Sequence, residues 1–275
     1  MKTVKLGARS VPALGQGTWR LGEDRRGKAQ ETAAIHDGIA RGLTLIDTAE
    51  MYGDGETESF LGEALLGLRD QVYLVSKVYP QNAGRGPIER ACEASLRRLR
   101  TDRLDLYLLH WRGSVPLAET IEGMEALQKA GKIGDWGVSN FDTADMAQLA
   151  KAGGDGCVTN QILYNLARRG PEFDVFPDLQ RRGIAAMAYS PIEQGALPSS
   201  AALTQIAKRR SATIFQIALA WVLRQPGLVA IPKASSVSHM AENAAAAEIA
   251  LTEAELAAID SELPPPRRKT PLEML

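Results

Sequence analysis

The sequence predicts an α/β fold, a single (β/α)8 TIM barrel. Short apolar runs alternate with helical patterns along the whole chain, and this alternation favours a parallel sheet with right-handed crossovers. Eight such units in about 250 residues is the count of this barrel. No linker or charge block divides the chain, so we expect residues 1–275 to form one domain.

The first element is a predicted β-hairpin, in which residues 3–6 and 10–13 flank a turn at residues 7–9. The eight predicted barrel strands are residues 14–19, 43–47, 71–77, 104–110, 133–138, 157–161, 184–189 and 228–231. The predicted helices are residues 28–41, 56–68, 87–99, 117–130, 142–152 and 174–182, helices within 199–224, and residues 238–246 and 252–262. From about residue 264, after a run of prolines, we expect an irregular tail.

The main structural alternative is an open, doubly wound sheet. That fold would place a glycine-rich G-x-G-x-x-G turn between its first strand and first helix. Gly15 and Gly17 are followed by Gly22, but no helix pattern begins there. The sequence therefore favours the closed barrel.

Composition excludes several classes of function. The net charge is −1, from 32 Lys and Arg against 33 Asp and Glu, which gives no electrostatic reason to bind nucleic acid or an anionic membrane. No apolar run approaches the length of a membrane span, and the N-terminus lacks a signal-peptide core. Cys92 and Cys157 fit no disulfide or zinc spacing, so we expect no metal. These features predict a soluble cytoplasmic protein.

Four side chains with acid–base chemistry stand at or just beyond the ends of three consecutive predicted strands: Asp47, Tyr52, Lys77 and His110. Each alone has an ordinary explanation, as a turn cap, a solvated lysine or a structural histidine. Catalytic groups of a barrel lie at the carboxyl ends of its strands. Their coincidence on neighbouring strands therefore favours an active site.

The chemistry of this set is coherent for reducing a carbonyl group. A phenol has a pKa near ~10, and a nearby ammonium group lowers it, so Lys77 would bring Tyr52 into range as a general acid. Asp47 would hold Lys77 in place, and His110 would donate a hydrogen bond to the carbonyl oxygen. No side chain supplies a hydride, so a cofactor must.

Seven segments, in order and at barrel spacing, resemble the aldo-keto reductase family over nearly the whole chain. They are residues 42–62, LVSK ending at Lys77, LDLYLLH ending at His110, GVSNF (137–141), TNQ (159–161), AYSP (188–191) and IPKASSVSHMAEN (231–243). The resemblance implies a barrel whose bottom is closed by the hairpin, with Tyr52 as proton donor. YGDGETE, LLHW and IPKASS resemble the bacterial reductases of methylglyoxal and other small aldehydes, although GDGETE makes a longer turn than many members have.

The same resemblance implies a nicotinamide cofactor site. Ser139, Asn140 and Gln161 would hold the carboxamide, Tyr189 would stack on the nicotinamide, and the loop from Ser190 would follow the pyrophosphate. The full set of implied cofactor residues is Gly17, Thr18, Trp19, Ser139, Asn140, Gln161, Tyr189, Ser190, Pro191, Ile231, Lys233, Ala234, Ser235, His239, Glu242 and Asn243. Residues 139–141 also suit a helix N-cap.

Cofactor choice is less sharply specified. Lys233 suits the 2′-phosphate of NADPH, but His239 stands where the family commonly has arginine, and an arginine would grip a phosphate with two donors. We expect NADPH, with NADH as the alternative.

An aromatic substrate pocket is expected from Trp19, Tyr79 and Trp111, around Tyr52. Such a pocket suits neutral small aldehydes, ketones or α-dicarbonyls such as methylglyoxal. Trp111 alternatively packs under a loop. In this family the C-terminal tail often edges the pocket, which here would involve Leu272, Met274 and Leu275.

The sequence thus predicts an NADPH-dependent carbonyl reductase, a monomer rather than an oligomer, acting on small-molecule aldehydes or ketones. Two alternatives keep the fold. One is an NADP-sensing regulatory subunit of low turnover, and the other is an alcohol-oxidising dehydrogenase.

Overall fold

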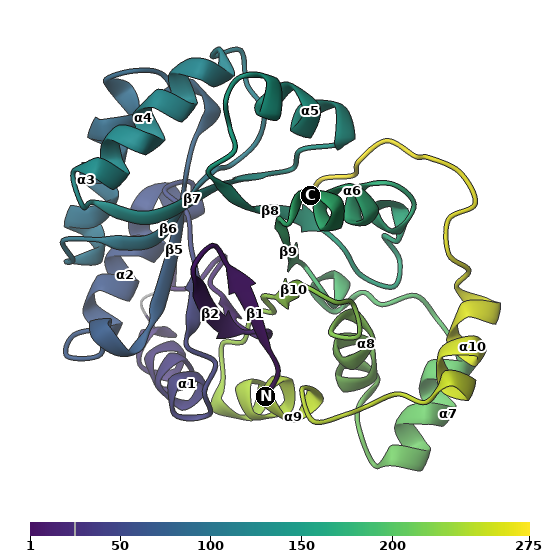
Figure 1. Cartoon of the computed structure of the whole chain (residues 1–275). Helices are drawn as coiled ribbons and strands as arrows, with labels where there is room; N and C mark the ends of the chain where they lie inside the picture. The colour runs from purple at the N-terminus through teal and green to yellow at the C-terminus, as the bar shows by residue number, and fades with distance from the viewer. Residues whose placement is uncertain (25) are drawn as a thin grey trace.

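The fold is that of a computed structural model, which describes residues 1–24 and 26–275. Among these residues, eight parallel strands form one sheet in the order β10-β9-β8-β7-β6-β5-β4-β3 (Figure 1). They are β3 (Gln16–Gly17), β4 (Leu45–Asp47), β5 (Tyr73–Val78), β6 (Leu104–Leu109), β7 (Ile133–Ser139), β8 (Cys157–Leu163), β9 (Ala185–Tyr189) and β10 (Leu228–Ala230).

The sheet closes on itself between its first and last strands. Leu14 forms a parallel bridge with Ala230, and Gly17 forms another with Lys233. A Cβ at Gly17 would lie 2.6 Å from the carbonyl oxygen of Ile231, so this closure requires glycine. The predicted (β/α)8 barrel is confirmed.

Helices surround the barrel (Figure 1). They are α1 (Lys28–Ala40), α2 (Glu56–Ala64), α3 (Pro87–Leu99), α4 (Leu117–Lys129), α5 (Thr143–Lys151), α6 (Val175–Arg182), α7 (Ala201–Arg210), α8 (Ile214–Val222), α9 (Val237–Ala246) and α10 (Glu253–Glu262). α1 and α9 lie side by side, so the outer ring closes where the sheet does. Within the described part of the chain, no helix is long and apolar enough to cross a membrane.

The strands are buried on both faces because they separate two apolar layers. In β6, Leu106 and Leu108 point into the barrel, whereas Leu104, Tyr107 and Leu109 pack against the helices. This two-sided burial explains why the strands appear in the sequence as nearly continuous apolar runs.

The hairpin of β1 (Thr3–Leu6) and β2 (Arg9–Pro12) closes one end of the barrel. Its apolar side chains join the interior layer, together with residues at the starts of strands such as Tyr73 and Ala185. Arg9 binds Asp105, near the start of β6, at 2.6 Å. The hairpin therefore covers the amino ends of the strands, and the carboxyl ends stay open.

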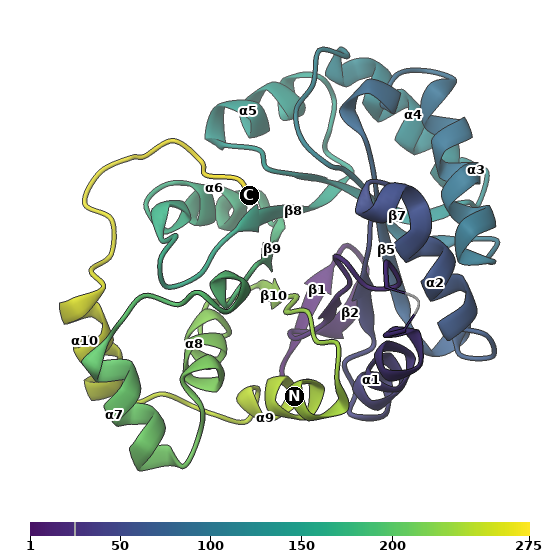
Figure 2. The ribbon, with the colours of Figure 1, turned by 180° about the vertical axis from the view of Figure 1, so that it is seen from behind.

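Several predicted boundaries shift. The predicted strand 43–47 begins at Leu45, and the predicted helix 56–68 ends at Ala64, before a turn at Gly67 (φ 77°). The region 199–224 divides into two helices because Thr213 begins α8 with a capping box. After α10, residues 264–275 contain no helix or strand and run back toward β8 and β9 (Figure 2).

Candidate active site

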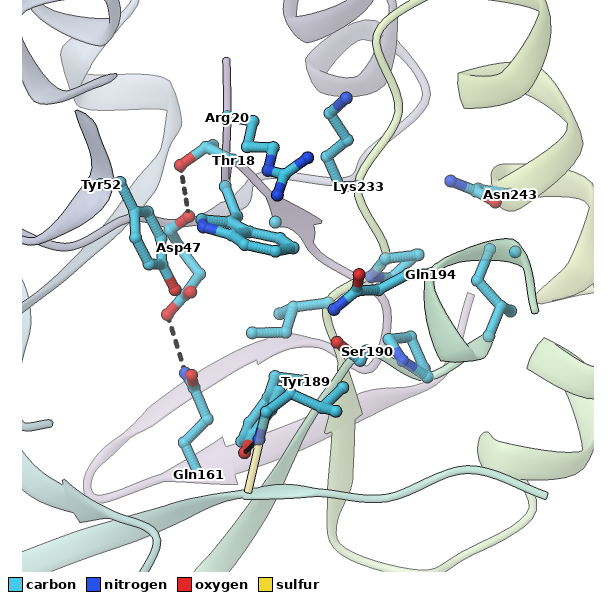
Figure 3. A pocket seen from close by; sticks show the side chains of 18 of the residues that line it. Thr18, Arg20, Asp47, Tyr52, Gln161, Tyr189, Ser190, Gln194, Lys233 and Asn243 are labelled. Atoms are coloured by element: carbon cyan, nitrogen blue, oxygen red, sulfur yellow. Dashed lines mark hydrogen bonds between the residues drawn. The ribbon is translucent and has the colours of Figure 1, made fainter. Parts of the chain in front are cut away.

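A cavity of about 950 Å³ lies at the carboxyl ends of the strands, near the upper limit for cofactor sites. Its wall includes most of the residues that the sequence predicted: Gly17, Thr18, Trp19, Asp47, Tyr52, His110, Trp111, Ser139, Asn140, Gln161, Tyr189, Ser190, Pro191, Ile231, Lys233, His239, Glu242 and Asn243. Figure 3 shows Tyr52 and Asp47 on one side of the cavity and Asn243 on the other.

Lys77 is completely buried behind the cavity wall and organises its floor. Its Nζ donates to Asp47 Oδ1 at 2.6 Å, to the Thr48 carbonyl oxygen at 2.8 Å and to the Tyr52 hydroxyl at 3.0 Å. Burial alone would lower the pKa of Lys77, but Asp47 and Tyr52 raise it above its ordinary value. The ammonium group therefore keeps its charge.

The predicted direction of the Tyr52 pKa is wrong. Burial raises that pKa above its ordinary value, and the charge of Lys77 only partly opposes the rise. The sequence places an ammonium group near Tyr52, but it does not show how far burial desolvates the phenol. As a result Tyr52 keeps its proton at neutral pH, and Lys77 is placed to stabilise the phenolate once the proton leaves.

His110 stands across from Tyr52, with ring centroids 6.0 Å apart and planes at 75°. Burial, reinforced by the charge of Lys77, lowers the pKa of His110 to about 2. Its Nδ1 is buried without a hydrogen-bond partner in the described structure. The imidazole is therefore neutral, and one of its nitrogens carries a proton that can be donated.

Side chains from β7, β8 and β9 form the next part of the wall. Gln161 Nε2 donates to Asp47 Oδ2 at 2.8 Å, which links this wall directly to the floor (Figure 3). Asn140 Nδ2 donates to the His110 carbonyl oxygen and to Ser139 Oγ, both at 3.1 Å. The Tyr189 hydroxyl donates to Asn140 Oδ1 at 3.0 Å. The predicted carboxamide-binding set thus stands beside the acid–base set.

The far end of the cavity combines cations with a helix N-terminus. Lys233 and Arg20 lie near each other on one side (Figure 3). Thr213 and Ile214, at the start of α8, line the same cavity, and a helix N-terminus favours anions. Ala234 and Ser235 are not among the lining residues.

Aromatic and apolar side chains form the mouth, where Trp19, Trp111, Met274 and Leu275 line the cavity. Tyr79, predicted as a substrate-binding residue, is not on this wall. It packs edge-on against Trp111 with centroids 5.8 Å apart, so any effect on substrate would pass through that ring. Sequence spacing could not show which aromatic ring lies in front.

Backbone strain concentrates at the cavity. Of the eight non-glycine residues with positive φ in the described chain, four line it: Arg20, Asn140, Ser190 and Gln194. Such conformations are costly and cluster at functional sites. The volume of the cavity, its cationic end and its amide-lined wall together fit an extended dinucleotide.

Several lining residues were not predicted from the sequence, namely Arg20, Met51, Thr213, Ile214 and Phe215. The capping-box spacing of Thr213 and Gln216 was a readable signal for a helix start. Arg20 offered no comparable signal. No cluster of three metal-binding side chains occurs among residues 1–24 and 26–275.

Comparison with known proteins decides the family. A sequence model described as "Aldo/keto reductase family" matches residues 13–263. The chain belongs to this family. Methylglyoxal reductase YeaE of Escherichia coli K12 is 52% identical over 272 residues, covering 97% of this chain and 96% of its own. Glyoxal reductase of Bacillus subtilis is 32% identical, covering 94% and 92%.

Solved structures agree. The crystal structure of an aldo/keto reductase from Klebsiella pneumoniae, in complex with NADP and acetate, matches with a TM-score of 0.97 at 52% identity. The match covers 100% of this chain and 99% of that one.

The low pKa of His110 predicts a pH-dependent loss of stability. Below the ordinary histidine pKa of 6.5, His110 is protonated in the unfolded chain. In the folded chain it stays neutral down to about pH 2. This stability is fully present above 6.5 and falls with falling pH. Between about pH 7 and about pH 5, wild type should lose about 2 kcal/mol more unfolding free energy than His110→Gln, measured by urea denaturation.

His239→Gln is the control, because the side chain of His239 is exposed. This variant should lose as much unfolding free energy as wild type over the same pH range. Equal losses in wild type and His110→Gln would show that folded His110 takes up its proton over the same pH range as it does in the unfolded chain, and that its pKa is not lowered.

Proposed function

We propose that this protein reduces the carbonyl group of small aldehydes and α-dicarbonyls of the methylglyoxal type to alcohols, with NADPH. The observation that carries the proposal is the 3.0 Å contact between Lys77 Nζ and the Tyr52 hydroxyl on the floor of a dinucleotide-sized cavity. The names of the relatives from E. coli and B. subtilis support the substrate class.

The acid–base residues work on the carbonyl oxygen. Bound NADPH supplies the hydride that the carbonyl carbon accepts. Tyr52 gives its proton to the oxygen, and Lys77 stabilises the phenolate that remains. Asp47 holds the Lys77 ammonium group, and neutral His110 donates a hydrogen bond that polarises the carbonyl.

The cofactor residues divide along the cavity. Ser139, Asn140 and Gln161 would hold the nicotinamide carboxamide. Tyr189, at the end of β9, would lie against the nicotinamide ring. Lys233 and Arg20 would hold phosphate groups, because they are the cations that line the far side among the described residues. An apolar mouth favours neutral substrates over anionic sugars.

Removing the Tyr52 hydroxyl should abolish reduction and preserve cofactor binding. For Tyr52→Phe we expect methylglyoxal turnover to fall about a thousandfold. NADPH should still quench tryptophan fluorescence with an unchanged Kd, since Trp19 and Trp111 line the cavity.

Tyr73→Phe is the matched control. Tyr73 lies at the start of β5, near the hairpin, and its hydroxyl has no partner in the described structure. Its removal should leave turnover intact. Undiminished turnover in Tyr52→Phe would remove Tyr52 from the role of acid.

Lys233 should set the preference for NADPH. Replacing it in Lys233→Met should raise the KM for NADPH roughly tenfold and leave the KM for NADH unchanged, because only NADPH carries a 2′-phosphate. Lys208→Met, on α7, is a control outside the lining residues. An equal rise for both cofactors would place Lys233 at another phosphate.

We also propose that the chain is one domain acting as a cytoplasmic monomer. The acid–base and cofactor-binding groups assigned above all belong to a single chain, so the proposed reaction requires no residue from a second copy. Cys92 and Cys157 are buried free thiols, as suits a reducing compartment. Light scattering after size exclusion should give a mass near 29.7 kDa. A multiple of that mass would contradict the monomer.

A further inference from the structure

The loop after β9 contains an unusual turn. Glu193 (φ 47°), Gln194 (φ 52°) and Gly195 (φ 91°) are consecutive residues in the left-handed region. Side-chain-bearing residues rarely adopt this conformation unless surrounding contacts hold them there. Gln194 and Gly195 line the cavity. Whatever holds this turn therefore also shapes the cavity wall.

Three side chains hold it. Glu193 Oε2 accepts from Asn165 Nδ2 at 2.5 Å, and Glu193 Oε1 accepts from Arg168 Nε at 3.0 Å. Asn165 is completely buried, and its Nδ2 also donates to the carbonyl oxygen of Ser190 at 2.9 Å. Ser190 has a positive φ as well.

The other side of Arg168 reaches the C-terminal tail. Its Nη1 donates to Glu273 Oε1 at 2.6 Å. Met274 and Leu275, which follow, line the mouth of the cavity, and the Leu275 amide donates to the Tyr189 hydroxyl at 3.4 Å. The ion pair with Glu273 thus anchors the segment that edges the mouth.

We propose that Arg168 is a positioning residue that sets cofactor affinity through Glu193 and substrate range through Glu273. A guanidinium group suits this role, because its planar fork presents separate donors to two carboxylates. Arg168 itself is not among the lining residues. The inference rests on the proposed NADPH-dependent reduction, since it assigns what each arm of Arg168 controls.

Two isosteric variants, Glu193→Gln and Glu273→Gln, test the two arms separately. The measurements are the NADPH Kd, from tryptophan quenching, and the ratio of kcat/KM for 4-nitrobenzaldehyde to that for methylglyoxal. In Glu193→Gln the Kd should rise about fivefold with the ratio unchanged, because the strained turn loses the carboxylate charge that binds Arg168. In Glu273→Gln the released tail should raise the ratio about threefold, with Kd within roughly twofold of wild type.

Arg168→Gln should produce both changes, and adding Glu273→Gln to it should change the ratio no further. Arg168→Lys keeps the charge but loses the forked guanidinium group. Its NADPH Kd and its kcat/KM ratio should both lie between those of wild type and Arg168→Gln. It also serves if Arg168→Gln folds poorly, which thermal unfolding of the cofactor-free protein would reveal.

Glu63→Gln is the matched control. Glu63 is half-exposed and pairs with Arg100 at 3.1 Å, as Glu273 pairs with Arg168, but it lies on α2 outside the lining residues. It should behave as wild type in both measurements.

The outcomes separate the two proposals. If wild type neither binds NADPH nor reduces methylglyoxal, the proposed function fails. If wild type does both, and Arg168→Gln matches it, the positioning role is overturned. If Glu273→Gln raises the Kd as much as Glu193→Gln does, the separation of the two arms is wrong.

Discussion

The site depends on one buried ammonium group. Burying the charge of Lys77 is costly unless all of its donors are matched, and it has three. Asp47, the Thr48 carbonyl oxygen and Tyr52 accept them. This match requires β4 and β5 to pair in one register, Asp47 opposite Val75, which brings Lys77 two residues further along to the same rim. Errors in strand pairing would leave a buried charge without partners.

Hydrogen bonds extend from the ion pair of Lys77 and Asp47 around the rim of the barrel. The second oxygen of Asp47 binds Gln161, and Asn140 joins the His110 backbone to the Tyr189 hydroxyl. These residues come from five strands or the loops after them, and only a closed parallel barrel brings their carboxyl ends together. The acid–base groups and the amide wall therefore form one hydrogen-bonded structure, in which a cofactor would meet groups already oriented.

Much of this could be predicted from the sequence, because burial on both faces makes each strand an apolar run and a polar residue marks its end. Lys77 and His110 were readable for that reason. Arg20 could not be predicted, and for Thr213 only the start of a helix was predictable, since both residues reach the cavity only through the closure of the barrel and the approach of α8. Tyr79 was misplaced because strand spacing identifies the rim but not the order of side chains in front of it.

The pKa of Tyr52 and the backbone strain near the cavity could not be predicted from the sequence. The pKa of Tyr52 depends on burial as well as on Lys77, and burial depends on every neighbour. Backbone strain has the same origin. Glycine is the residue usually expected in the left-handed region. Glu193 occupies that region because Asn165 and Arg168 hold its carboxylate. These two partners lie 25 to 28 residues away along the chain. The strain is therefore a property of the folded barrel, maintained by contacts between the segments that follow β8 and β9.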